Sequence, residues 1–199
     1  MSVKDSENSN TSIKPGDTIL VTGASGFIGG HLAHQLFNGG YKVRALYRRE
    51  KLTPRLISLQ AMGADIRRAD LTIPEQRQAV LEKVDAVVHV AGLPSDWGDF
   101  KIFKRVNYDI TAEILMEAEK AGCRVFVYIS SISVHGFGEH RGTTESGPYY
   151  PLISHYQQTK KMAEDFVLRQ NKNTFRTCAV RPGNVYGPGD TTVFFRIFD

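Results

Sequence analysis

Tyr156 and Lys160 stand four positions apart in the stretch SHYQQTKKMAE, a spacing at which a phenol and an ammonium could handle a proton together. Helix-forming residues without Gly or Pro predict a helix over 155–170, so both side chains should lie on one helix face. A free tyrosine has a pKa of about 10, and a neighbouring positive charge lowers it toward neutrality. The spacing predicts either an acid–base tyrosine tuned by Lys160 or an ordinary pair on an exposed helix.

A second chemical signal is the stretch TGASGFIGG, in which three glycines recur at every third position between a β-branched run and a helical pattern. Gly23 suits a tight turn off a strand, Gly26 lets backbone N–H groups approach a pyrophosphate, and Gly29 lets the helix pack closely on the sheet. The alternative is a glycine-rich turn without a ligand. The predicted dinucleotide-binding loop comprises Gly23, Ala24, Ser25, Gly26, Phe27, Ile28 and Gly29.

The residues after the next two predicted strands should contact the adenosine of a dinucleotide. An acidic residue after the second strand would favour NAD, but Tyr47 stands there and two arginines follow. Arg48, with Arg49 as the alternative, therefore predicts a 2′-phosphate and NADP(H), unless this basic loop merely faces water; NAD(H) stays open. After the third strand, Asp70 and Leu71 are placed to hold the adenine amino group. Asp70 is equally well placed to cap the following helix.

These side chains need a scaffold, and the chain alternates β-branched runs with amphipathic segments. The predicted strands cover 18–22, 42–47, 64–69, 85–91, 124–130 and 176–182. The clearest predicted helices cover 27–38, 74–83, 100–121 and 155–170. This alternation predicts an α/β, doubly wound parallel sheet, the Rossmann fold. Residues 1–15 read as a disordered polar tail, and 16–199 as one NAD(P)-binding domain.

Composition restricts the classes of function. The 199 residues are 41% hydrophobic and 23% charged, which suits one globular domain, and the net charge of +4 is too dispersed to favour nucleic acid. No apolar run is long enough to span a bilayer, and no signal-peptide core is present. Cys123 and Cys178 lie in apolar, strand-like surroundings, which predicts buried reduced thiols and a cytoplasmic location. His89 and His135 lack metal-ligand spacing to the cysteines, so we expect structural roles for them and no metal site.

Six short motifs follow one another over 18–190, and their order is more specific than any one of them: TGASGFIGG, DLT, HVAG, YISSISVHG, YQQTK and RPGNVYGPGD. Together they resemble the extended short-chain dehydrogenase/reductase family. The resemblance implies that Tyr156 passes the proton, that Lys160 also binds the nicotinamide ribose, and that Ser131 holds the substrate oxygen. Ser130 is the alternative serine, and only one of the two should face the site because strands alternate. The remaining implied residues are Asn107, which is otherwise a structural helix residue, and the cofactor-wall residues Ala91, Gly92 and Pro182.

The resemblance implies hydride transfer between NADP(H) and a carbonyl or secondary alcohol. The stretches SDWGDFKIFKRVN and SSISVHG look most like the 3β-hydroxysteroid and sterol dehydrogenase branch. A nucleotide-sugar epimerase or dehydratase is an alternative, although SISVHG lacks the Thr-Asp-Glu segment common in dehydratases. A non-catalytic regulatory module is a second alternative, although such proteins usually lose the tyrosine or the lysine.

Two further expectations concern assembly and length. Relatives often pair through the fourth helix and the tyrosine helix, so a homodimer is compatible with the resemblance. They also usually continue well past the sixth strand into a substrate-covering domain, whereas this sequence ends at TTVFFRIFD. We therefore expect a truncated form with a cofactor site, an uncovered apolar VFFRIF run and no closed substrate pocket.

Overall fold

A six-stranded parallel sheet forms the centre of the computed structural model, which describes residues 11–95 and 97–190. The strand order is β3-β2-β1-β4-β5-β6. The strands are β1 (Thr18–Thr22), β2 (Lys42–Tyr47), β3 (Asp65–Arg68), β4 (Ala86–His89), β5 (Val125–Ile129) and β6 (Arg176–Val180). All six predicted strands are present, with four of them shorter by a few residues, and the predicted doubly wound fold is confirmed.

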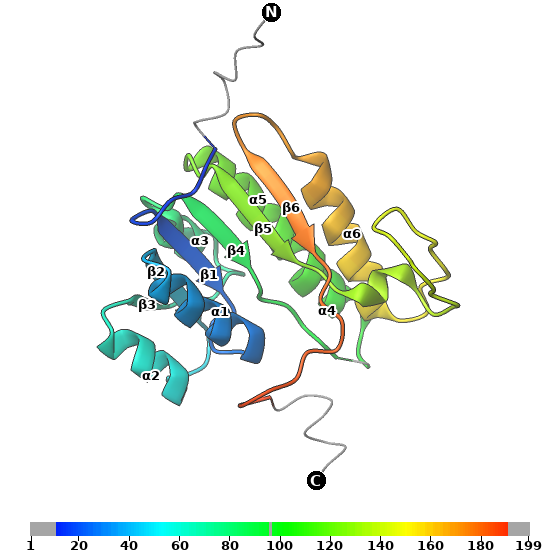
Figure 1. Cartoon of the computed structure of the whole chain (residues 1–199), viewed down its shortest axis with the longest axis horizontal. Helices are drawn as coiled ribbons and strands as arrows, with labels where there is room; N and C mark the ends of the chain where they lie inside the picture. Colours follow the sequence, from blue (N-terminus) through cyan, green and yellow to red (C-terminus); the bar gives the residue numbers. More distant parts are fainter. Residues whose placement is uncertain (1–10, 96, 191–199) are drawn as a thin grey trace, which may run out of the picture.

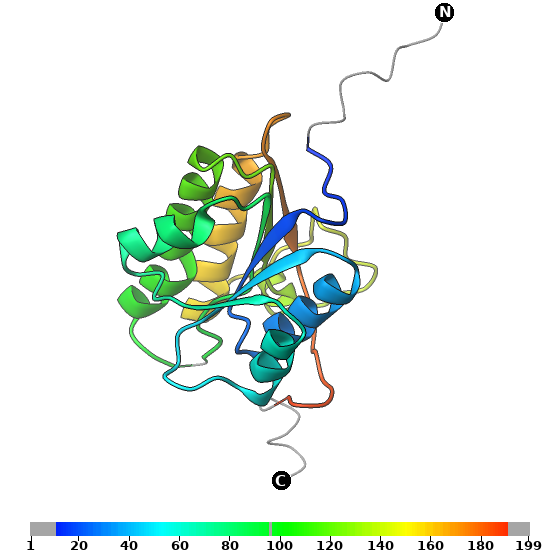
Figure 2. The same ribbon diagram turned by 90° about the vertical axis from the view of Figure 1, so that its left-hand side faces the viewer.

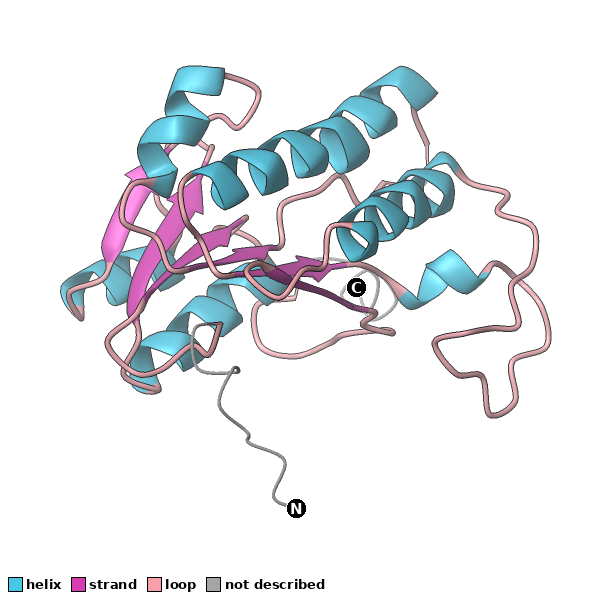
Figure 3. Ribbon diagram, turned by 90° about the horizontal axis from the view of Figure 1, so that it is seen from above, coloured by secondary structure: helices cyan, strands magenta, loops and turns pink. Residues whose placement is uncertain are grey.

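Helices cover both faces of the sheet (Figures 1 and 2). They are α1 (Phe27–Asn38), α2 (Pro54–Ala61), α3 (Pro74–Leu81), α4 (Phe100–Phe103), α5 (Ile110–Lys120) and α6 (His155–Arg169). A π-helical turn, η1 (Lys104–Asp109), joins α4 to α5, and a 3-10 turn, η2 (Ile132–His135), follows β5. Seen from above, α5 and α6 run side by side over one face of the sheet (Figure 3). Helices α1 and α2 lie against the other face.

Two apolar cores form because alternate residues of each strand point to opposite faces. Leu20, Val87 and Phe126 point toward α3, α5 and α6, where Leu115 and Val167 complete one core. On the other face, the second core is built from strands β1, β2 and β4 together with α1 and α2; its buried members are Ile19, Val21, Ala24, Ala33, Val43, Ala45, Leu56, Leu59, Ala86 and Val88. The sheet is thereby fixed in register from both sides.

The topology directs function to one edge of the sheet. Strand β1 pairs with both β2 and β4, so the connections leaving the carboxyl ends of β1 and β4 depart toward opposite faces. Open α/β sheets bind ligands in the crevice at such a switch point. The glycine loop follows β1, and the predicted cofactor-wall residues Ala91 and Gly92 follow β4.

Two helical features differ from the predictions. Helix α2 was not expected; the Thr53 hydroxyl caps it by accepting from the Leu56 N–H at 3.4 Å, and Pro54 occupies its first turn. The predicted single helix over 100–121 contains the π-helical turn η1 between α4 and α5. A π turn places one extra residue in the helix and shifts the faces on either side relative to each other.

Three smaller expectations can also be compared with the structure. Cys123 is buried, as predicted, but Cys178 is exposed, because it lies on the face of β6 that α6 does not cover. The Ser12 carbonyl accepts from Arg124 Nη1 at 2.6 Å and Ile13 packs against the second core, so these residues of the predicted tail contact the domain. Within the described ranges, no helix is long and apolar enough to cross a membrane. Residues 1–10 of the tail and the VFFRIF run lie outside those ranges.

Candidate active site

The glycine loop forms a cradle in which side chains would not fit. Gly23 has φ +65°, and a Cβ there would lie 2.9 Å from the Ala91 nitrogen. A Cβ on Gly29 would overlap the Gly23 carbonyl. The Ala24 N–H donates to the Leu46 carbonyl at 3.0 Å, which ties the loop to β2. The predicted roles of Gly23 and Gly29 therefore have a direct structural basis.

Helix α1 begins directly after this loop, and its start is suited to an anion. Gly26 is the N-cap, and it brings no side chain to cap the first-turn N–H groups. Helix N-termini carry partial positive charge and bind phosphate through such N–H groups. With Ser25, Phe27 and Ile28 supplying the rest of the turn, the cradle fits the pyrophosphate of a dinucleotide.

The predicted adenosine side brings a basic and an acidic residue together. Arg48 and Arg49 are exposed after β2, and the charge of Arg48 contributes to lowering the pKa of Asp70. The larger causes of that lowered pKa are hydrogen bonds from Thr72, whose N–H and hydroxyl reach Asp70 Oδ1 at 2.9 and 2.8 Å. Leu71 packs against the first core.

The alternative role of Asp70 as a helix cap is wrong. Ile73 is the N-cap residue of α3 and offers no side-chain cap. Asp70, three residues before that N-cap, instead closes a turn through its bonds to Thr72. Its carboxylate is thus held at the carboxyl edge of the sheet between β3 and α3.

Tyr156 and Ser131 come together across the site. Tyr156 lies in the first turn of α6, which a capping box of Ser154 and Gln157 starts. Burial raises the pKa of Tyr156, and the hydrogen bond with the Ser131 side chain offsets this only in part. Ser131 lies just past the end of β5, where its Oγ also accepts from the Ser133 hydroxyl at 2.9 Å. The Ser130 side chain is buried instead, as strand alternation requires, so Ser131 is the serine that meets the phenol.

Lys160 is buried and follows Tyr156 by four residues, about one helical turn further along α6. Lys160 is only 4% exposed, and its Nζ donates to the Ile129 carbonyl at 2.5 Å. The ammonium also lies 4.2 Å from the centre of the Tyr128 ring. Burial lowers the pKa of Lys160 to about 7, opposed by the charge of Glu164. The expected lowering of the Tyr156 pKa is not found, since burial raises that pKa.

A charged network that the sequence interpretation missed lies one turn further along α6. The buried Glu164 carboxylate accepts from Arg181 Nη2 at 2.6 Å. Arg181 also contacts His135 Nε2 at 2.7 Å and the Tyr149 hydroxyl at 2.9 Å, so it links β6, η2 and the loop before α6. Burial raises the pKa of Glu164, but the bond and charge of Arg181 outweigh it and lower that pKa. The recurrence of Tyr156, Lys160 and Glu164 every four residues was the available signal.

Asn107 connects the wall of the site to the tyrosine helix. It is buried in η1; its Oδ1 accepts from the Leu93 N–H at 2.7 Å and its Nδ2 donates to Thr159 Oγ1 at 3.2 Å. A Cβ on Gly92 would approach Asn107 Oδ1 to 3.2 Å. Asn107 thus positions the loop after β4 against α6. A π-helical turn at this point fits the tendency of such turns to occur at functional sites.

The histidines have structural partners, as predicted. His89 is fully buried between the hydroxyls of Thr22, at 2.9 Å, and Thr111, at 3.1 Å. Burial, aided by the charge of Lys160, lowers the pKa of His89 to about 3, so the ring is neutral at physiological pH. The Thr22 hydroxyl also accepts from the Ala91 N–H at 3.0 Å, which fixes that wall residue. The described residues contain no group of three or more metal-ligating side chains.

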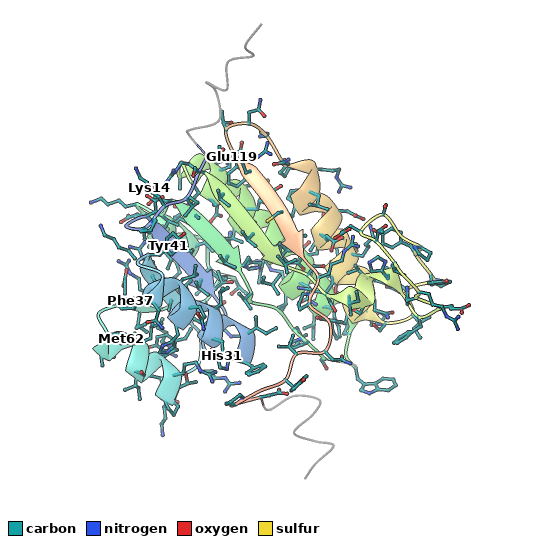
Figure 4. All side chains as sticks on the ribbon, in the orientation of Figure 1. Lys14, His31, Phe37, Tyr41, Met62 and Glu119 are labelled. Atoms are coloured by element: carbon teal, nitrogen blue, oxygen red, sulfur yellow. The ribbon has the colours of Figure 1, made fainter. Side chains whose placement is uncertain are left out.

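The segment after β6 returns to the glycine loop. Pro182 accepts from the Ile132 N–H at 2.9 Å, which places it beside η2. Further on, the Pro188 carbonyl contacts His31 Nε2 at 3.1 Å and Arg55 Nη2 at 3.0 Å; Figure 4 labels His31 on α1. The site is therefore assembled from the loops that follow the strands together with η1 and the first two turns of α6.

Comparison with known proteins identifies the family to which the chain belongs. Residues 19–198 match the family described as NAD dependent epimerase/dehydratase. The chain is 34% identical to a 3 beta-hydroxysteroid dehydrogenase/Delta 5-->4-isomerase of Mycobacterium tuberculosis over 91% of its length and 50% of that protein. It is 33% identical to the decarboxylating sterol-4-alpha-carboxylate 3-dehydrogenase of Saccharomyces cerevisiae, over 87% of its length and 52% of that protein.

The chain is also similar in fold to a solved structure. The UDP-glucuronic acid 4-epimerase of Bacillus cereus, in complex with NAD, is similar with a TM-score of 0.74 and 30% identity. That similarity covers 87% of this chain and 58% of the epimerase. The chain therefore spans about half the length of the curated relatives it matches.

Proposed function

Because the chain belongs to the NAD dependent epimerase/dehydratase family, we propose that it is the cofactor-binding part of an oxidoreductase acting on a carbonyl or secondary alcohol. The observation that carries this proposal is the proximity of Ser131 to Tyr156, with the buried Lys160 one helical turn further along α6. A phenol and a serine hydroxyl converge on one point, which suits proton transfer to a substrate oxygen.

Each residue has a distinct part in this proposal. The Tyr156 hydroxyl gives or takes the proton, and the Ser131 hydroxyl orients both the phenol and the substrate oxygen. Lys160 supplies positive charge one helical turn from the phenol and donates N–H bonds to the ribose. A bound nicotinamide dinucleotide supplies or accepts the hydride. Asn107 holds the loop after β4 against α6 and thereby keeps Ala91 and Gly92 at the cofactor wall.

NADP(H) is the favoured cofactor. The support is Arg48, an exposed arginine that directly follows Tyr47, the residue standing where an acidic side chain would favour NAD. A guanidinium binds a phosphate through charge-assisted bonds that are stronger than neutral ones. NAD(H) is the alternative, favoured by the NAD bound in the similar epimerase structure.

The proposed substrate is apolar and steroid- or sterol-like. Large apolar side chains are exposed on the segments that follow β4, β5 and β6, among them Trp97 (88% exposed), Phe137 (70% exposed) and Tyr186 (74% exposed). Exposed apolar surface beside a site marks contact with an apolar ligand or a further protein surface. The similarity to the steroid and sterol dehydrogenases points the same way.

A nucleotide-sugar epimerase is the second candidate, since the similar solved structure is a UDP-glucuronic acid 4-epimerase. A regulatory module without turnover is the third, although both Tyr156 and Lys160 are retained. The two free cysteines of the described residues support a reducing, cytoplasmic location, and pairing of α5 and α6 with a second copy is the proposed assembly.

One experiment distinguishes these candidates. The longest available form is mixed with NADPH or NADH and with ketosteroids, small ketones or UDP-sugars, and the absorbance of the reduced nicotinamide is followed. We expect a net loss of absorbance with an apolar ketone. Sugar interconversion without a net absorbance change would support the epimerase, and cofactor binding without turnover of any substrate would support the regulatory module.

A further inference from the structure

We propose that Tyr128 is a positioning residue for the proposed reaction, whose ring face holds the Lys160 ammonium in place one helical turn from Tyr156. This inference rests on the proposed function for its catalytic meaning, but the contact itself is a property of the fold. Tyr128 lies on β5 and is 1% exposed, among the largest side chains of the first core. The sequence interpretation assigned it no role.

The geometry around Lys160 defines two anchors. Nζ donates to the Ile129 carbonyl at 2.5 Å and lies 4.2 Å from the centre of the Tyr128 ring. An ammonium has three N–H groups, so these anchors fix its position and leave a donor direction for a ligand or the phenol. A cation over an aromatic face is stabilised most when both are removed from water, as here.

The Tyr128 ring must offset the free-energy cost of burying the charged Lys160 side chain. Lys160 is 4% exposed, and burial favours the neutral amine. The groups that act on it electrostatically are Glu164 on α6 and His89 on β4, which is neutral. Glu164 accepts hydrogen bonds from Arg181, so its negative charge acts on both Arg181 and Lys160. The Tyr128 face is therefore a main local support of the charged form of Lys160.

The Tyr128 hydroxyl separates this role from ordinary hydrogen bonding. It is buried and has no hydrogen-bond partner among the described residues. An unpaired buried hydroxyl costs stability, so the hydroxyl is not what makes the residue useful. Tyr128→Phe should accordingly preserve the Lys160 contact, and the melting temperature should stay equal or rise.

The test measures the titration of Lys160 directly. Carbon-13 at the lysine Cε positions is followed by NMR as the pH is raised, with Lys160 assigned through Lys160→Arg. Position 128 carries phenylalanine or its difluorinated and trifluorinated analogues, which withdraw electrons from the ring face while keeping its shape. We expect the apparent pKa of Lys160 to fall stepwise along this series, by about one unit or more in total.

Phe126 provides the matched control. It is a fully buried aromatic on the same strand and face, with its ring 6.0 Å from that of His89. The same analogues at position 126 should leave the titration of Lys160 unchanged. A flat series at position 128, or an equal shift from position 126, would overturn the proposal.

Tyr128→Leu removes the aromatic face altogether and allows a second measurement that could refute the proposal. The affinity for NADP(H) or NAD(H) is titrated against pH in parallel. If Lys160 binds the ribose as a cation, the alkaline loss of affinity should move to lower pH in step with its pKa. Stepwise NMR shifts without any change in the affinity profile would leave the ring contact standing and contradict the proposed function of Lys160.

Discussion

Asn107 Nδ2 donates to Thr159 Oγ1 at 3.2 Å, and this bond joins the π-helical turn to the helix that carries Tyr156 and Lys160. Thr159 passes the contact to the backbone, since its hydroxyl reaches the carbonyls of His155 and Tyr156 at 2.7 and 3.2 Å. The first turn of α6 is therefore held from the side as well as by its own capping box.

Asn107→Ala should release the loop after β4 from helix α6, because this amide joins Leu93 to Thr159. It leaves the Leu93 N–H and Thr159 without their partner, at a cost of about 1–3 kcal/mol in the free energy of unfolding. Asn107→Asp retains the acceptor for Leu93 but loses the donor to Thr159, so its cofactor affinity should lie between those of Asn107→Ala and the parent. Denaturant unfolding and calorimetric titration measure both effects. Equal affinity in all three proteins would refute the positioning role.

Tyr156→Phe should lower turnover by roughly 10²–10⁴-fold while cofactor affinity stays nearly unchanged, because only the proton-transferring oxygen is removed. The test uses the longest form that shows turnover. Tyr41→Phe is the control; Tyr41 precedes β2, at the opposite edge of the sheet from His31 (Figure 4), and should have no effect on rate. Turnover above a hundredth of the parent rate would remove Tyr156 from its proposed role.

Gly23→Ala should abolish cofactor binding as well as lower stability. The new Cβ would meet the Ala91 nitrogen at 2.9 Å, at a backbone φ of +65° that disfavours any side chain. Gly122→Ala is matched for backbone strain, since Gly122 has φ +85° but nothing within 4 Å of a Cβ. Both variants should lose about 1 kcal/mol to the left-handed conformation, and only Gly23→Ala should lose the cofactor. Retained binding in Gly23→Ala would contradict the proposed pyrophosphate cradle.

Arg48→Ala should weaken NADP(H) binding and leave NAD(H) binding almost unchanged, because the guanidinium would contact only the 2′-phosphate. The double variant with Arg49→Ala tests whether the neighbouring arginine substitutes for it. Arg169→Ala, an exposed arginine at the end of α6, controls for net charge. If parent and double variant bind the two cofactors with the same ratio of dissociation constants, this basic loop has no part in cofactor choice.

Glu164→Gln should destabilise the protein by about 3 kcal/mol, because it leaves the Arg181 charge without its carboxylate. The pKa of Glu164 is lowered in the folded state, so its contribution to stability is present above the ordinary glutamate value of about 4.3 and is lost as the pH falls through the lowered value. The acid limb of the stability profile should flatten in the variant. Asp165→Asn, which breaks the more exposed pair with Lys161, should change stability little. An unaltered acid limb in Glu164→Gln would show that this ion pair does not govern acid unfolding.

The strands and the glycine loop were predictable because each is encoded by contiguous residues. Helix α2 was not, since its eight residues carry only two buried leucines, Leu56 and Leu59, and too little periodicity for a pattern to emerge. The exposure of Cys178 was also hidden, because it depends on which face of β6 receives a helix. Strand alternation left two serines open, and the burial of Ser130 together with the effect of Ser131 on the pKa of Tyr156 separates them.

The electrostatics of the site were the least accessible to prediction. The spacing of Tyr156 and Lys160 suggested a pKa lowered by charge, whereas burial dominates and raises it. Burial depends on β5 and on the core beneath it, which lie far from α6 in the sequence. The same reason explains why the Tyr128 ring, the Arg181 partner of Glu164 and the amide link of Asn107 went unpredicted.

The central place of β1 in the sheet also bears on how the chain can assemble during synthesis. Among the six strands, β1 is synthesised before the others and pairs with both β2 and β4, so each of the other five can add to an edge that already exists. Growth then proceeds outward, through β2 and β3 on one side and β4, β5 and β6 on the other. A rearranged chain that began at β2 and ended with β1 would instead have to insert this middle strand last, between the finished pair β2–β3 and the finished set β4–β6.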